Sequence, residues 1–163
     1  MALALPDLVD GLIRLDEPTP PAGPPEAAER WFRAFWAHAQ GMQHLNPATL
    51  EAAKGAAQGV FLPALAPAFV VSPVPLPFLT ALEGALRAAW AVLSTPAFLL
   101  PTYASGVPAP APLAPLLLAV VPVGLPSPSK RPPRAMMAGI IHSWTLTHTV
   151  VPVAPPNTPI PFA

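Results

Sequence analysis

The sequence lacks cysteine and carries little charge, and both features exclude particular kinds of chemistry. Without cysteine, the chain forms no disulfide and offers no thiolate as a metal ligand or nucleophile. Charged residues make up 10% of the 163 residues, whereas an ordinary soluble domain carries about 25%. The net charge is zero, and the one basic cluster, residues 130–134, is too short to predict nucleic-acid binding.

The chain also lacks the motifs of catalysis. It has no glycine-rich phosphate-binding loop. His38 and His44 are separated by a spacing that suits no common zinc site. His142 and His148 would share a metal only across a contact between two copies of the chain, which stays open as an alternative. We therefore expect a protein that is not an enzyme and has no cofactor, metal or small-molecule substrate.

Signals for secretion and for membrane spanning are weak. Asp7 and Asp10 interrupt the N-terminal apolar run and no basic segment precedes it, so no signal peptide is expected. A spanning helix needs about 20 continuous apolar residues. The two best windows, 88–107 and 113–125, are broken by proline or too short. A membrane-associated protein with its uncharged middle region in lipid is therefore the alternative, not the preferred interpretation.

Proline is abundant, and it occurs among apolar residues. The chain has 28 prolines and 53% hydrophobic residues, and residues 88–129 contain no charge. Disordered chains are usually poor in apolar residues and rich in charge, so we expect these proline-stiffened segments to lie against protein surfaces. Composition divides the chain into a helical region at 1–62, an uncharged proline-rich region at 63–132, and a C-terminal region at 133–163.

Helices are predicted where apolar residues recur at helical spacing between proline and glycine signals. The predicted helices cover 3–15, 26–41, 46–59, 78–94 and a short segment from 133. Trp31 and Phe35 lie four residues apart on the second helix, and Trp90 lies on the apolar side of the fourth. Such stripes usually form a core, and here we also expect them to contact partner proteins. A short edge strand at 69–71 is the most that the intervening prolines allow.

Residues 140–151 alternate strictly between a bulky face and a threonine-rich face, which predicts a half-buried β-strand. The sequence contains no second strand of similar quality. The strand is therefore expected to pair with another chain by β-augmentation. The predicted partner-binding residues are Trp31, Phe35, Trp90, Trp144, Leu146, His148 and Val150.

The segment 138–150 and the ending Pro159-Ile160-Pro161-Phe162 resemble small alanine- and proline-rich structural proteins of phages and phage-tail-like (contractile injection) particles. The resemblance is confined to the C-terminal region and carries over no functional residues. It implies a component of the tail or baseplate region. Such a component is made in a bacterial cytoplasm and assembled with other structural subunits, copies of itself included.

These observations predict a mainly α fold with extended proline-rich arms and one C-terminal β-strand. We expect the chain to be non-compact and ordered by partner chains. Its expected function is structural: it binds neighbouring subunits of a large particle through its helices, its arms and its strand.

Overall fold

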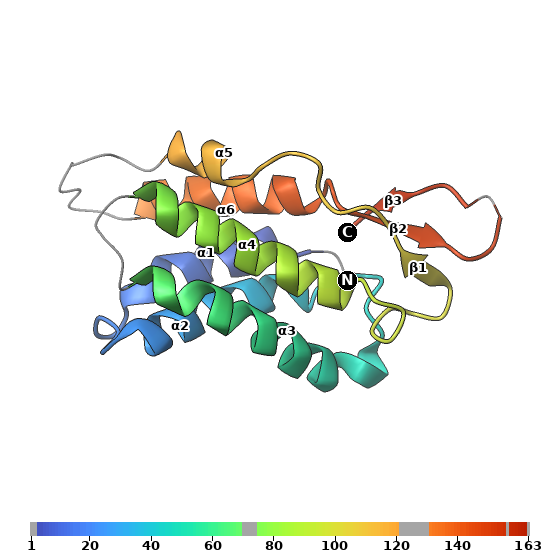
Figure 1. Cartoon of the computed structure of the whole chain (residues 1–163), viewed down its shortest axis with the longest axis horizontal. Coiled ribbons are helices and arrows are strands. Elements are labelled where there is room, and N and C mark those ends of the chain that lie inside the picture. Colours follow the sequence, from blue (N-terminus) through green and yellow to red (C-terminus); the bar gives the residue numbers. More distant parts are fainter. Residues whose placement is uncertain (1–2, 70–74, 121–130, 156, 163) are drawn as a thin grey trace.

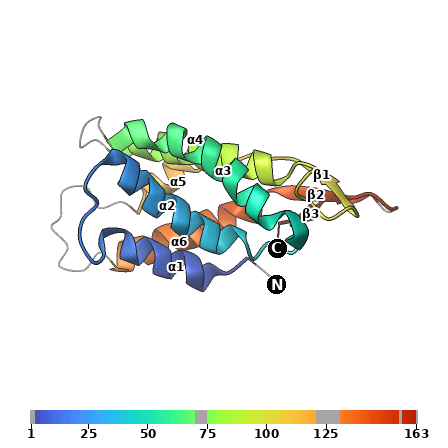
Figure 2. The same ribbon diagram turned by 90° about the horizontal axis from the view of Figure 1, so that it is seen from below.

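The computed structural model describes residues 3–69, 75–120, 131–155 and 157–162, and it is mainly helical. The helices run side by side along the long axis, and a small sheet stands at one end (Figure 1 and Figure 2). The helices are α1 (Leu5–Ile13), α2 (Pro24–Ala39), α3 (Leu50–Leu65), α4 (Pro75–Leu93), α5 (Ala114–Leu118) and α6 (Arg131–Thr145). Short 3-10 helical turns are η1 (Arg14–Asp16), η2 (Pro47–Thr49) and η3 (Ala66–Phe69). The strands are β1 (Tyr103–Ser105), β2 (Thr149–Pro152) and β3 (Ile160–Pro161).

The helices pack on one another within the single chain. α3 packs against α4, and α1 packs against both α2 and α6. One cluster of buried hydrophobic residues, from Leu3 to Phe162, takes members from all three of the regions that composition predicts. The mainly helical fold is confirmed. The expected non-compact arrangement, ordered by partner chains, finds no support.

The first two helices cross at small residues. Gly11 of α1 lies against Ala34 of α2, and a Cβ added at Gly11 would come within 2.7 Å of the Ala34 Cβ. A larger residue at either position would therefore push the two helices apart. α2 begins at Pro24, two residues before the predicted start at 26, and proline suits the first turn because its missing N–H has no intrahelical partner there anyway.

α3 runs farther than its sequence predicts. Asn46 caps η2, the turn that leads into α3, with its side-chain oxygen accepting from the Ala48 N–H at 3.0 Å. The helix was expected to end at Gly59, but it continues through Pro63 to Leu65. Phe61 and Leu65 are fully buried on the same face. Their burial offsets the backbone hydrogen bond that the internal proline removes.

The strand predicted at 140–151 is largely wrong, because α6 extends to Thr145 and only Thr149–Pro152 is strand. Ile141 and Trp144 lie three apart, which suits a helical face. Both are buried in the core. The Thr145 hydroxyl donates to the Ile141 carbonyl at 2.9 Å, so a β-branched residue is accommodated in the last turn. Packing against α1 and α5 outweighs the local β-propensity of this segment.

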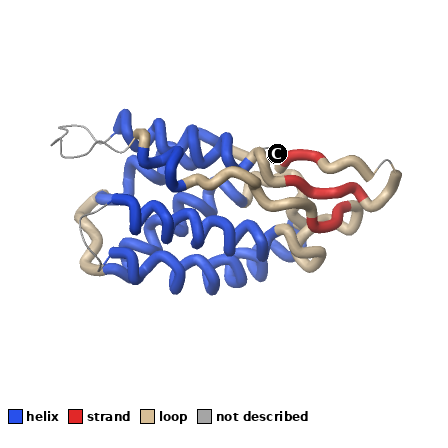
Figure 3. The backbone as a smooth tube through the Cα atoms, turned by 45° about the horizontal axis from the view of Figure 1, so that its top comes forward, coloured by secondary structure: helices blue, strands red, loops and turns tan. Residues whose placement is uncertain are grey.

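β2 is paired on both sides inside the chain, by two short strands that the sequence does not predict, and pairing with another chain stays a prediction. It is the middle strand of an antiparallel sheet in the order β1-β2-β3 (Figure 3). Ser105 pairs with Val150 on one side, and Ile160 pairs with Val150 on the other. Gly106 comes directly after β1 in the sequence and lies very close to Thr149 of β2. Any side chain at Gly106 would collide with the Thr149 carbonyl. Of the edge strand predicted at 69–71, Phe69 lies in η3, and residues 70–71 lie outside the described residues.

Candidate functional site

Phe162 fills a socket in the chain's own core. Its side chain is 1% exposed, and its ring stacks on His148 with centroids 5.3 Å apart. The centroid of the Trp90 ring lies 5.2 Å from that of Phe162, and Trp144 contacts His148 edge to face, with centroids 4.6 Å apart. The Phe162 N–H donates to the His148 carbonyl at 2.9 Å. We call Trp90, Trp144 and His148 the C-terminal socket.

Three histidines are buried: His38, His44 and His148. Burial lowers the pKa of both His38 and His148 to about 4. The Ala4 carbonyl, 3.2 Å from His38 Nδ1, opposes that shift. The backbone of Thr145 and Trp144 opposes the shift at His148, although neither ring nitrogen meets strict hydrogen-bond geometry with a described residue. His38 and His148 are therefore neutral at pH 7, and the described part of the chain holds no group of three residues suited to a metal ion.

The Glu83–Arg87 pair of α4 fastens the proline-rich arm at 109–114. Arg87 donates to two carbonyls of the arm at 2.7 and 2.8 Å. The Glu83 carboxylate accepts from the N–H groups of Leu113 and Ala114 at 2.9 and 2.8 Å. Burial alone would raise the pKa of Glu83, but these N–H groups and the guanidinium hold it below its usual value. The 109–114 arm is thus bound by α4 of the same chain.

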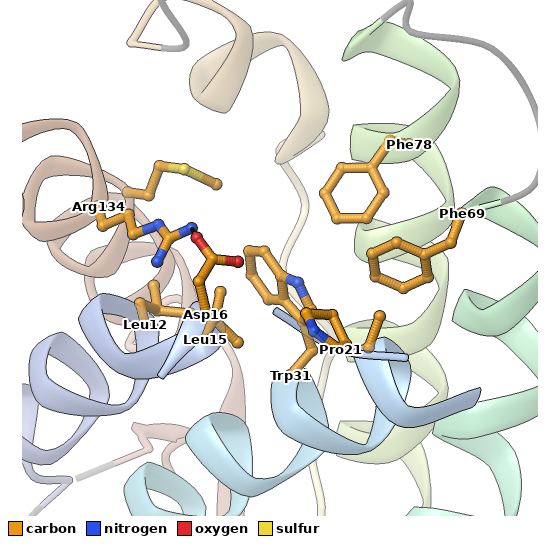
Figure 4. A pocket seen from close by; sticks show the side chains of 10 residues that line it. Leu12, Leu15, Asp16, Pro21, Trp31, Phe69, Phe78 and Arg134 are labelled. Carbon is orange, nitrogen blue, oxygen red and sulfur yellow. Dashed lines mark hydrogen bonds and ion pairs between the residues drawn. The ribbon is translucent and has the colours of Figure 1, made fainter. Parts of the chain in front are cut away.

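A cavity of about 340 Å³ lies where α1, α2, α4 and α6 approach one another (Figure 4). The ring of Phe78 lies 5.5 Å from that of Trp31 and 5.2 Å from that of Phe69. Across the cavity, Asp16 and Arg134 form an ion pair with a 2.6 Å N···O distance. Because these two charges satisfy each other, the cavity offers aromatic surface and no unpaired charge to a ligand.

An apolar groove of about 630 Å³ runs along the outer side of α6 beside α5. The rim residues Leu116 and Met136 are 48% and 55% exposed. A Cβ added at Gly139 would meet no atom within 4 Å, so this glycine leaves the groove open. The residues that line this α5–α6 groove are uncharged: Ala111, Leu116, Ala119, Val120, Met136, Gly139, Ile140, Ser143, Trp144 and Thr147. Residues 121–130, which join the two helices, lie outside the described part of the chain.

Most of the predicted partner-binding residues lie in this chain's own core. The buried members of the set are Phe35, Trp90, Trp144, His148 and Val150. Phe35 and Trp90 contact each other edge to face, with centroids 5.2 Å apart. Trp31, in the cavity of Figure 4, and Leu146 keep partial exposure. The structure thus brings the aromatic residues together inside the molecule, and contact with a partner stays a prediction.

Sequence reasoning missed the α5–α6 groove. Its walls come from helices separated by the uncharged proline-rich run, so no periodic pattern connects them. The sequence did contain one signal. Met136, Gly139 and Ser143 recur at helical spacing, which places one exposed and two small residues on one side of α6. Interpreting 140–151 as a strand concealed this pattern.

No protein-family model, curated protein or solved structure matches this chain. Among the described residues, one helix, Leu76–Leu93, is long and apolar enough to cross a membrane by length and composition alone. Core helices meet the same criterion, and Leu79, Leu82 and Leu93 of this helix are fully buried against the rest of the chain.

Proposed function

We propose that the protein is a structural subunit of a phage virion or phage-tail-like particle, in its tail or baseplate region. In this proposal it binds an apolar helix of a neighbouring subunit in the α5–α6 groove. The observation that carries the binding role is the groove itself, which is exposed, apolar and free of charge. The class of assembly is supported by the C-terminal sequence pattern alone.

The chemistry of the groove selects its occupant. A charged group placed in the groove would lose its hydration without gaining a partner, at a cost of several kcal/mol. The contacting face of the occupant is therefore apolar. Gly139 and Ser143 lie one helical turn apart on α6, and small residues at this spacing let a second helix approach closely. An apolar helix laid into a hydrophobic groove is a recurrent mode of protein recognition.

The titratable groups favour recognition over catalysis. His38 and His148 are buried in the core, and Glu83 and Arg87 are engaged with the 109–114 arm. None of these groups lines the α5–α6 groove. The proposal therefore assigns the groove to binding a polypeptide.

Membrane association is less well supported. Inserting α4 into lipid would require the Glu83–Arg87 pair to release the arm at 109–114 and enter the bilayer. It would also remove Leu82 and Leu86 from the core that they share with the other helices. We therefore do not adopt it as a second function.

A glycine substitution blocks the groove without disturbing the fold. Gly139→Leu fills open space and replaces a poor helix former, so the variant is expected to fold at least as stably as the natural chain. Gly55→Leu is the matched control, because Gly55 is also helical, lies on α3 and meets nothing within 4 Å. Tagged chains are expressed in the cells that naturally produce the protein, and lysates are separated by density-gradient sedimentation.

The natural chain and Gly55→Leu are expected to sediment with high-mass particles visible by electron microscopy, whereas Gly139→Leu stays in the light fractions. If Gly139→Leu sediments with the particles as well, the groove is not the binding site. If all three chains remain light or are recovered with membranes, the particle role itself is wrong.

A further inference from the structure

The C-terminal strand is attached to the rest of the fold by few contacts. β3 pairs with β2 only through Thr149↔Pro161 and Val150↔Ile160. Beyond this pairing, Phe162 is the one buried residue among the described residues after position 152. Every described residue from 153 to 159 is exposed, and these residues form the linker between the two strands.

The socket that receives Phe162 is built without β3. Trp90 is held by α4, and Trp144 by α6, where its Nε1 donates to the Ala111 carbonyl at 2.9 Å. His148 precedes β2, and its ring interacts with the backbone of Thr145 and Trp144, which lie outside β3.

The linker is long enough to carry Phe162 to another molecule. Residues 153–159, when extended, span about 23 Å at roughly 3.3 Å per residue. In an exchanged pair the same backbone and ring contacts form as in the single chain. Only the entropy of association then opposes exchange, which makes it accessible at high local concentration.

We propose that β3 exchanges between copies of this chain. Phe162 of one copy enters the C-terminal socket of a second copy, and Ile160-Pro161 pairs with the second copy's β2. The socket is thus a self-assembly site whose ligand is the C-terminal strand of an identical chain. This inference goes beyond the proposed particle role and does not depend on it, because it rests on the socket, the linker and the strand alone.

The absence of native cysteine permits a direct cross-linking test. The Phe162 N–H bonds to the His148 carbonyl, so the adjacent pair Thr149↔Pro161 is a non-hydrogen-bonded pair. Such pairs have Cα atoms about 4.5 Å apart, which a disulfide can bridge. Purified Thr149→Cys and Pro161→Cys chains are mixed and then oxidised. Since each chain carries one thiol, a mixed disulfide at this pair forms only between molecules.

The control mixes Thr149→Cys with Gly55→Cys, whose thiol is exposed on α3 and unrelated to the strand pairing. In an exchanged pair, each thiol meets the other at an effective concentration of about 1 mM. In the control, the thiols meet only at the protein concentration of about 10 μM, so about a hundredfold more mixed dimer is expected from exchange. The double variant Thr149→Cys/Pro161→Cys reports separately whether the register is formed.

Exchange is supported if the mixed dimer exceeds the control and declines when Phe162→Ala is added to the Pro161→Cys chain. It is overturned if the double variant forms only an intramolecular disulfide while the mixed dimer equals the control. Failure of the double variant to form any disulfide also overturns it, because the strand pairing is then absent.

Discussion

Replacing Phe162 with alanine tests how strongly the C-terminal strand stabilises the fold. Burying a phenylalanine side chain contributes roughly 1.5–3 kcal/mol. Its ring contacts with His148 and Trp90 add about 0.5–1 kcal/mol each. We expect Phe162→Ala to lower the free energy of unfolding by about 3 kcal/mol, at the low end of core Phe→Ala changes, because a chain end can detach and relax.

Urea unfolding followed by tryptophan fluorescence measures this loss, because Trp90 and Trp144 line the socket. The matched control is Val153→Ala, whose side chain is 58% exposed on the linker and whose loss should cost less than about 0.5 kcal/mol. A loss below about 1 kcal/mol for Phe162→Ala, with the control unchanged, would show that Phe162 is not anchored in the core.

Other features of the fold yield further predictions. Because the pKa values of His38 and His148 are about 4 when folded and near 6.5 when unfolded, the unfolded chain binds more protons below pH 6.5. Stability should therefore fall from pH 6.5 to 4, by on the order of 1 kcal/mol per pH unit per histidine in thermal unfolding, and a flat profile would refute the burial of these rings. His148→Leu should lower the free energy of unfolding by about 1 kcal/mol, because it removes the ring's interactions with the Thr145 and Trp144 backbone and its stacking on Phe162, and unchanged stability would contradict these contacts. Gly106→Ala should separate β1 from β2 and cost at least about 1 kcal/mol, read by faster amide exchange at Val151, whereas unchanged exchange would contradict the close approach. Glu83→Ala should expose the 109–114 arm to limited proteolysis, whereas Glu83→Gln, which keeps an acceptor oxygen, should protect the arm partly. Equal cleavage of both variants would refute the role of the Glu83 hydrogen bonds in holding the arm.

The helices were predictable because their signals are local. α1, α2 and α4 begin close to where proline permits a start, and their apolar residues recur at helical spacing. The end of α3 was missed because Gly59 is a common stop signal. Its effect is overridden by burial of Phe61 and Leu65, which depends on helices that the local sequence does not reveal.

The C-terminal region was misread because its pattern fits two periods. Bulky residues at 140, 142, 144 and 146 alternate as in a strand, while those at 137, 141 and 144 share one helical face. Contact of α6 with α1 settles the choice, and that contact joins segments more than 100 residues apart. β1 and β3 are too short to give a periodic signal of their own.

Neither candidate site could be assembled from the sequence. The C-terminal socket (Trp90, Trp144 and His148) and its occupant Phe162 come from α4, α6 and the two strand ends. The sequence analysis assigned Trp90, Trp144 and His148 to partner contact and gave Phe162 no role, and only the fold shows that these residues contact one another. The α5–α6 groove depends on α6 being a helix, so the strand interpretation hid it.

The most direct test of the proposed role is a competition for incorporation. Natural and Gly139→Leu chains, distinguished by tags, are expressed together, and their ratio in purified particles is compared with their ratio in the lysate. Loss of about 1.4 kcal/mol or more of binding at the α5–α6 groove predicts at least about tenfold depletion of Gly139→Leu from the particles, whereas Gly55→Leu should show none. Equal incorporation of Gly139→Leu and the natural chain would contradict the proposal that this groove joins the protein to its assembly.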